Sequence, residues 1–346
     1  MNRIIRKLTY GWKFKKYPLG AADPEAEYDR YAAKVAARGP LPAVPPVPPP
    51  PRAKPPVAPS GWPMDTLKAA DAQLGAIDQL APVTTRTLVL SAGESMTFRR
   101  IPAGSFLMGS TNGYPDEIVR VATVVQPFWI GEMEVMNAQY HAFDPAHDSR
   151  HQDQYGYDQV APGHVGNHRR QPVVRVSRDE AEAFCAWLSA RCGVKARLPT
   201  EEEWEWAARA GTATPFPWGG VDDDFGRWAN LADRDVRFMY STWDLAAAVQ
   251  QRRPYPPELN YPLHEERWTD DWFSLNFVGR ANANPWGLYD MHGNAAEWTA
   301  TTVDGRAIVR GGSFASRPKD ATSSFRQRYR PWQKVFDVGF RVVVEE

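Results

Sequence analysis

The chain has 346 residues, which is enough for one large domain with extensions or for two domains. Lysine and arginine together number 41, as do aspartate and glutamate, so the charge balance gives no sign of a nucleic-acid-binding protein. No apolar run approaches the ~20 residues of a membrane span, and the N-terminus does not resemble a standard signal peptide. The default expectation is therefore a cytoplasmic protein with no transmembrane span.

Residues 1–39 are predicted to form a basic, aromatic arm followed by a short helix. The first 17 residues hold six lysines and arginines and no acid. The aromatic residues among them recur with a period of two: Tyr10, Trp12 and Phe14. This period indicates an extended segment, with a disordered basic tail as the alternative. We expect the arm to dock onto its own domain, onto a protein partner or, as a peripheral contact, onto an anionic membrane surface.

A proline-rich linker and a lead-in helix separate the arm from the globular part. Residues 40–60 hold too many prolines for a helix or a sheet and should adopt polyproline II. We interpret them as a spacer, with a ligand for an aromatic-lined groove as the less favoured reading. Residues 61–84 carry apolar residues at helical spacing, which predicts a helix that leads into the next domain.

The globular part, residues 85–346, is predicted to be an α+β domain with little regular secondary structure. Capping boxes indicate two helix starts, one at Ser177 with Glu180 and one at Thr200 with Glu203. Most of the remainder is rich in Gly, Pro, Asn and Trp, with short strand-like segments. This composition is typical of a domain held together by aromatic packing and loop contacts.

Five sequence blocks in the globular part occur in one order. They are IPAGSFLMGS, PVVRVSRDEAEAFCAWLSARCGVKARLPTEEEWEWAARAGT, NPWGLYDMHGNAAEWT, VRGGSF and VGFRVV. Together they resemble the formylglycine-generating enzyme family, also called the sulfatase-modifying-factor domain family, over roughly residues 85–346. The resemblance implies the family's variant of the C-type lectin fold, which agrees with the α+β expectation.

The resemblance implies a copper site whose cysteine ligands this chain lacks. In the family's oxidases two cysteines follow the serine of the GGS motif by three and eight positions; counted from Ser313, these positions hold Ser316 and Ala321. Neither replaces soft sulfur as a Cu(I) ligand, so we predict no copper and no formylglycine-generating activity. The chain's own cysteines, Cys185 and Cys192, lie about 10 Å apart on one predicted helix and should be reduced thiols.

Positions 316 and 321, which hold Ser316 and Ala321, are called the two copper positions below. A pocket near them is the candidate ligand site. Its candidate residues are Trp298, Ser313, Ser316, Arg317, Arg326 and Arg328. Of these, Ser313 and Trp298 resemble the family's pocket serine and tryptophan. The arginines suit an acidic or carboxylate ligand or a protein surface. The alternative, which we favour for at least half of them, is that they brace loops.

The resemblance also implies two structural calcium sites. The first set of ligands comprises Asn230, the Leu231 carbonyl, Asp271 and the Phe273 carbonyl. The second set comprises Asn294, Glu297 and the carbonyls of Gly293 and Ala295. Hard oxygen ligands from loops are what Ca²⁺ takes. The alternative for the second set is that Asn294 and Glu297 only cap turns.

Four histidines are the remaining candidate metal ligands. They form two pairs at i, i+4 spacing: His147 with His151, and His164 with His168. On a helix each pair would share a face and could hold a transition metal. The intervening sequence is typical of a loop, so we expect polar histidines in a solvated insertion instead. Iron is not expected either, because the family's iron enzymes draw histidines from an extra helical domain and residues 1–84 contain none.

Three functional hypotheses follow from these features. The favoured one is a non-catalytic binding or assembly module, docked into a larger complex through its N-terminal arm; a partner could also associate it with a membrane. The alternative is a divergent non-heme metal-dependent oxidase or oxygenase with histidine ligands. A calcium-dependent carbohydrate binder is the third and weakest, since it rests on the lectin-like fold alone.

Overall fold

The computed structural model describes residues 84–149, 166–233, 265, 267–272 and 274–346. They belong to the larger of the chain's two compact units, Pro42–Glu346. The predicted arm, linker and lead-in helix lie outside the described residues, apart from Thr84. His151, His164 and Phe273 also lie outside them.

The main sheet is antiparallel and has five strands in the order β1-β2-β5-β11-β6. Its strands are β1 (Thr85–Ser91), β2 (Glu94–Ile101), β5 (Phe128–Gly131), β11 (Val343–Glu345) and β6 (Ala196–Arg197). Buried residues alternate along β1 and β2, as expected for strands with one face on the core. The strand β11 lies between β5 and β6. Segments from both ends of the described residues, β1 and β11, therefore belong to the same sheet.

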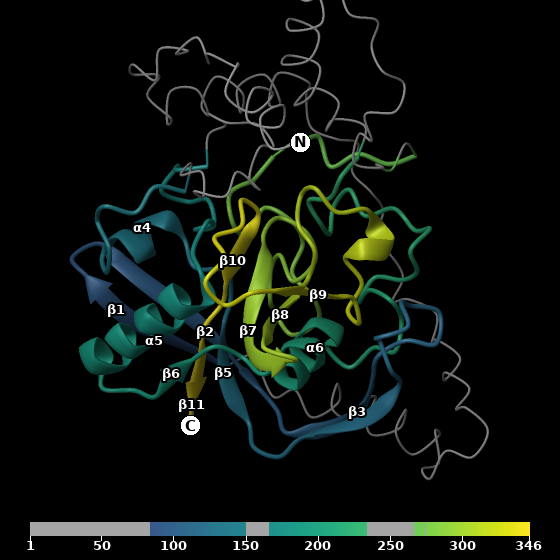
Figure 1. The fold of residues 1–346 in the computed structure, drawn as a ribbon, viewed down its shortest axis with the longest axis horizontal. Helices are drawn as coiled ribbons and strands as arrows, with labels where there is room; N and C mark the ends of the chain where they lie inside the picture. Colours follow the sequence, from purple (N-terminus) through teal and green to yellow (C-terminus); the bar gives the residue numbers. More distant parts are fainter. Residues whose placement is uncertain (1–83, 150–165, 234–264, 266, 273) are drawn as a thin grey trace, which may run out of the picture. The chain divides into compact units, whose positions relative to one another are not determined.

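A second sheet has four strands in the order β10-β7-β8-β9. Its strands are β10 (Val338–Phe340), β7 (Ala296–Val303), β8 (Arg306–Arg310) and β9 (Arg326–Tyr329). The β10–β7 pair is parallel and the other pairs are antiparallel. A separate hairpin is formed by β3 (Gly104–Met108) and β4 (Arg120–Val124). In Figure 1 the hairpin extends along one side of α6.

The described residues form few helices. They are α4 (Asn137–His141), α5 (Arg178–Cys192) and α6 (Glu201–Arg209), with a 3₁₀ turn η1 (Pro318–Asp320). Both predicted capping boxes are present, at Ser177 with Glu180 and at Thr200 with Glu203. The helix α5 packs beside β1, β6 and β7, whereas α6 packs against the hairpin, β7 and β8 (Figure 1).

Aromatic side chains fill two adjoining parts of the core. The part between α5 and the sheets holds Phe98, Phe184 and Phe340, all fully buried. The part around α6 holds Phe106 stacked on Trp206 at 5.2 Å between ring centroids. The α+β architecture with many ordered loops is therefore confirmed. Within the described residues, no helix is both long and apolar enough to span a bilayer.

Candidate functional site

The two copper positions follow β8, where two glycines turn the chain. Gly311 and Gly312 have φ values of 91° and 67°, a region that favours glycine. A Cβ atom added at Gly312 would lie 2.7 Å from the Cβ of Ala321. The backbone therefore passes so close to Ala321 that only glycine fits at this turn.

Hydroxyl groups hold the turn that carries Ser316. The Ser313 N–H donates to Ser316 Oγ at 3.0 Å, and the Ser316 N–H donates to the Ser313 carbonyl at 2.9 Å. Ser313 Oγ donates to Asp337 Oδ2 at 2.6 Å and accepts from the Ala315 N–H at 3.1 Å. Both hydroxyls thus brace the local backbone, and Ser313 is fully buried.

Ala321 lies in an apolar, water-excluded environment. Its methyl group belongs to a fully buried cluster with Phe216, Phe225 and Leu231. Its carbonyl oxygen lies 2.8 Å from Nδ1 of His292, which donates to it. Burial lowers the pKa of His292 to about 4. The imidazole is therefore neutral, and the methyl group at the second copper position packs among apolar side chains.

Trp298, predicted as part of the pocket floor, lies in the hydrophobic core. It is fully buried, its Nε1–H donates to the Val176 carbonyl at 2.9 Å, and Tyr329 packs against it edge-on. The structure therefore does not bring Trp298 to a surface where a ligand could reach it.

The three candidate arginines each bind an acid of a neighbouring element. Arg317 donates to Asp320 at 2.9 Å, Arg326 to Glu201 at 2.6 Å and Arg328 to Asp116 at 2.9 Å. Arg326 also donates to the Asp116 carbonyl at 3.1 Å, so two arginines of β9 hold the loop that precedes β4. In these contacts each of the three arginines pairs with an acid of this chain.

A buried charge network behind these arginines was not predicted. Arg310 of β8 donates to Glu201 at 2.9 Å and also pairs with Glu205, both on α6. Glu205 in turn binds Arg209 at 2.7 Å, and all four side chains are at most 4% exposed. Acids four residues apart share one face of a helix. The EEEWEWAAR segment therefore contained an indication of this network. Glu201 and Glu205 lie four residues apart, and Glu205 stands between two tryptophans that are buried in the core.

The first predicted calcium set retains an unpaired oxygen. Asn230 is buried, and its Nδ2 donates to the Ser274 carbonyl at 2.8 Å and to Asn294 Oδ1 at 3.0 Å. Its Oδ1 is buried and has no hydrogen-bond partner among the described residues. A buried acceptor without a donor is costly and suits a cation. Asp271 lies in the left-handed region, with φ of 62°, in the adjacent loop.

The side chains of the second predicted set do not fit a calcium ion in this arrangement. Glu297 accepts from Arg341 at 2.8 to 3.0 Å through both oxygens and from Trp204 Nε1 at 2.7 Å. Asn294 Oδ1 accepts two N–H groups, from Asn230 Nδ2 and the Asn276 backbone. The Arg341 guanidinium already supplies the positive charge that a cation would bring.

A second carboxyl group, that of Glu134, belongs to the same buried polar cluster. Glu134 accepts from Asn294 Nδ2 and from the Ala295 N–H, each at 2.8 Å. Burial, together with the nearby carboxylates of Asp290 and Glu297, raises the pKa of Glu134. Burial likewise raises the pKa of Asp290 to about 6. The cluster therefore binds protons more readily than ordinary carboxylates do.

Each histidine of the described residues has a ring nitrogen close to a backbone group. His147 is partly buried with its Nε2 3.0 Å from the Val174 carbonyl, and burial lowers its pKa. His168 is buried, accepts the Arg170 N–H on Nδ1 at 3.1 Å and packs on Phe277 at 4.2 Å between centroids. The expectation of a solvated position is wrong for His168, because its ring is buried between the Arg170 backbone and the Phe277 ring. Among the described residues, no group of three or more His, Cys, Asp or Glu is placed to hold a metal.

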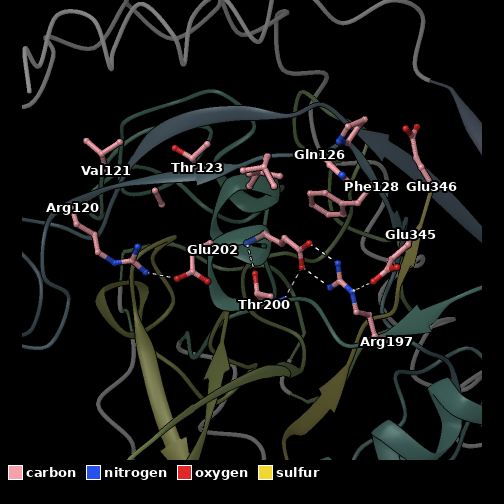
Figure 2. A pocket seen from close by; sticks show the side chains of 15 residues that line it. Arg120, Val121, Thr123, Gln126, Phe128, Arg197, Thr200, Glu202, Glu345 and Glu346 are labelled. Carbon is pink, nitrogen blue, oxygen red and sulfur yellow. Dashed lines mark hydrogen bonds and ion pairs between the residues drawn. The ribbon is translucent and has the colours of Figure 1, made fainter.

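A groove lies apart from these residues, between β4 and the first turn of α6 (Figure 2). Its volume is about 470 Å³. One wall consists of residues 120–128, and the other walls are lined by Arg197, Thr200, Glu202, Glu203, Glu345 and Glu346. None of the predicted pocket residues lines it.

The fold and the glycine turn define a loop-rich α+β domain of the formylglycine-generating-enzyme type. Residues 91–346 match the Sulfatase-modifying factor enzyme 1-like domain, and the chain belongs to this family. Solved structures support the fold. PvdO from Pseudomonas aeruginosa is 23% identical, with a TM-score of 0.57 over 75% of this chain and 98% of that one. Treponema denticola variable protein 1 is 20% identical, with a TM-score of 0.55; the match covers 76% of this chain and 99% of that protein.

Relatives in the family carry different functional names. A formylglycine-generating enzyme of Mycobacterium tuberculosis is 30% identical over 58% of this chain and 72% of its own length. An inactive C-alpha-formylglycine-generating enzyme 2 of Bos taurus is 25% identical; the match covers 72% of this chain and 86% of the relative. A hercynine oxygenase of Mycobacterium tuberculosis is 28% identical; the match covers 50% of this chain and 36% of the relative. Family membership alone therefore does not decide between an enzyme and a non-catalytic protein.

Proposed function

We propose that this protein is a family member without copper chemistry that serves as a non-catalytic binding or assembly module. The observation that carries the proposal is the environment of Ala321, whose methyl group is fully buried among aromatic and aliphatic side chains. Cu(I) is held by soft sulfur ligands, and position 321 offers a methyl group in a site packed with carbon.

The chain's two thiols do not substitute for the missing pair. Cys185 and Cys192 both lie on α5, and Cys185 is buried in the core beside the main sheet. Burial raises the pKa of the Cys185 thiol far above its usual range. Metal binding and nucleophilic attack both need the thiolate, so this thiol is a packing group. The inactive relative from Bos taurus is a precedent for family members without the reaction.

The binding role is proposed to involve the arm and linker, residues 1–60, and a protein partner. The basic, aromatic composition of residues 1–17 supports a docking segment, and the proline-rich stretch supports a spacer. Deletion of residues 1–60 tests this part. Co-purified partners and the cellular location should both change in the truncated protein, and an unchanged location with no partner in either form contradicts it.

The second candidate is a metal-dependent oxygenase with histidine ligands, and the similarity to a hercynine oxygenase favours it. His147 supplies a neutral imidazole, the form that binds metals, because burial lowers its pKa. Elemental analysis of full-length protein purified without chelators separates the two candidates. Near-stoichiometric iron or copper supports the oxygenase, and its absence supports the binding module.

A structural calcium ion is proposed at the first set alone, held by Asn230, the Leu231 carbonyl and Asp271. The unpaired, buried Oδ1 of Asn230 supports it. Such an ion would stabilise the loops of a domain that has little regular secondary structure. It would supply no chemistry to a reaction.

A further inference from the structure

The groove of Figure 2 follows the outer edge of β4. Residues 120–128 line it without interruption. Because successive side chains of a strand point to opposite faces, a face would contribute only alternate residues. No residue of β3 lines the groove, so it lies on the side of β4 that faces away from its hairpin partner. The main chain of β4 is therefore part of the groove wall.

Among the described residues, no further strand occupies this edge of β4. Within the part of the chain that the structure describes, β4 pairs with β3 alone. No backbone bond connects residues 120–127 to any other described element. An open strand edge is a template for a further strand. Val125, at the end of this edge, is 81% exposed and offers an apolar contact.

Acidic side chains outnumber basic side chains in the lining of the groove. Its lining holds four carboxylates, Glu202, Glu203, Glu345 and Glu346, against two guanidinium groups, Arg120 and Arg197. At one end Arg120 pairs with Glu202, and at the other end Arg197 is shared between Glu203 and Glu345. Figure 2 shows these two clusters at opposite ends of the groove. Arg100 and Lys195, which pair with Glu346 and Glu345, lie outside the lining.

We propose that the groove binds an extended peptide segment of a partner protein, which adds to β4 as a strand and carries lysine or arginine at alternate positions. Main-chain hydrogen bonds to the edge would supply affinity, and alternate side chains would face the acidic wall. A volume of about 470 Å³ is within the range of small ligand sites. This inference deepens the binding role proposed above by naming the surface and the class of partner.

Fluorescence anisotropy with the full-length protein and synthetic peptides tests the proposal. The probe is a labelled ten-residue peptide that alternates lysine with threonine or valine. The controls are the same peptide with glutamate in place of lysine and two versions N-methylated at alternate residues, in the two registers. We expect saturable, salt-sensitive binding of the lysine peptide and of one N-methylated register. The glutamate peptide and the other register should lose about tenfold or more in affinity.

Matched variants locate the site. Glu345→Lys with Glu346→Lys, and separately Val125→Lys, should weaken binding about tenfold. Val89→Lys is the control, since Val89 is 69% exposed on β1 and does not line the groove. The proposal is overturned if no peptide binds, if both N-methylated registers bind as well as the parent, or if Val89→Lys weakens binding as much as Val125→Lys. These measurements need no metal, so their failure leaves the proposed loss of copper chemistry untouched.

Discussion

The imidazole of His292 donates from Nδ1 to the carbonyl of Ala321 at 2.8 Å, and both side chains are buried. This bond connects the segment before β7 to the second copper position. Phe216 and Trp218 pack edge-on against the imidazole at 5.1 and 5.2 Å between centroids. Protonation of His292 would place a charge inside this aromatic environment, so folding and pH are coupled here.

The first prediction concerns acid stability. The pKa of His292 is about 4 in the folded protein and near 6.5 when exposed, so the unfolded chain binds the proton more strongly between these values. The His292 contribution to stability is therefore complete above about pH 6.5 and is lost as pH falls towards 4. Urea unfolding measures the free energy of unfolding at pH 7 and at pH 4.5. Between these pH values the His292→Asn variant should lose on the order of 2 kcal/mol less of this free energy than the wild type does. An identical loss in both proteins would count against this view of His292.

The second prediction concerns the buried network of α6 and β8. Glu205→Gln leaves Arg310 and Arg209 with one fewer charged partner in the core. Breaking a buried ion pair in this way costs about 3–5 kcal/mol. The matched control is Lys334→Ala at the partly exposed Lys334–Glu180 pair, which should cost about 1 kcal/mol or less. Chemical denaturation measures both, and equal costs would contradict the importance assigned to the buried pair.

The third prediction separates the two calcium sets. Calcium should raise the thermal midpoint of the wild-type protein relative to a chelator control, because a ligand that binds only the folded state stabilises it. Asn230→Ala should abolish this shift. Glu297→Gln should lower the midpoint in both conditions, because it weakens the Arg341 pair, and should leave the calcium shift intact. Loss of the shift in Glu297→Gln but not in Asn230→Ala would reverse the assignment.

Local features of this fold could be predicted from the sequence, whereas long-range pairings could not. The capping boxes at Ser177 and Thr200 involve residues three apart, so a short window contains both partners. The Arg326–Glu201 pair joins residues 125 positions apart, and only the packing of α6 beneath β8 and β9 brings them together. The sequence therefore indicated that arginines would brace loops without naming their acids.

The same distinction applies to the candidate sites. The two copper positions came from the family resemblance, by counting from Ser313 within one segment. The fully buried position of Trp298 depends instead on β7 lying inside the second sheet, between β10 and β8. The groove along β4 has walls from segments more than 200 residues apart, Arg120 and Glu345 among them, so no local pattern could reveal it.

The fourth prediction is that sulfur can be restored to the two copper positions. In the double variant Ser316→Cys with Ala321→Cys, the second thiol replaces a methyl group in the apolar cluster around Phe216. Thiolates supply the soft ligands that Cu(I) prefers. We expect the variant to bind Cu(I) under reducing conditions in competition with a chelator. Single variants serve as controls, because one thiolate alone should bind at least about tenfold more weakly.

The most direct test of the central claim is an oxidation assay on the wild-type, full-length protein. The protein is incubated with Cu(I), oxygen and a synthetic peptide that contains the cysteine segment of a sulfatase, and aldehyde formation is followed by mass spectrometry. A formylglycine-generating enzyme, such as the Mycobacterium tuberculosis relative, is the positive control. The proposed function predicts no aldehyde above the copper-only background. Copper-dependent conversion of the peptide by the wild-type protein would contradict it.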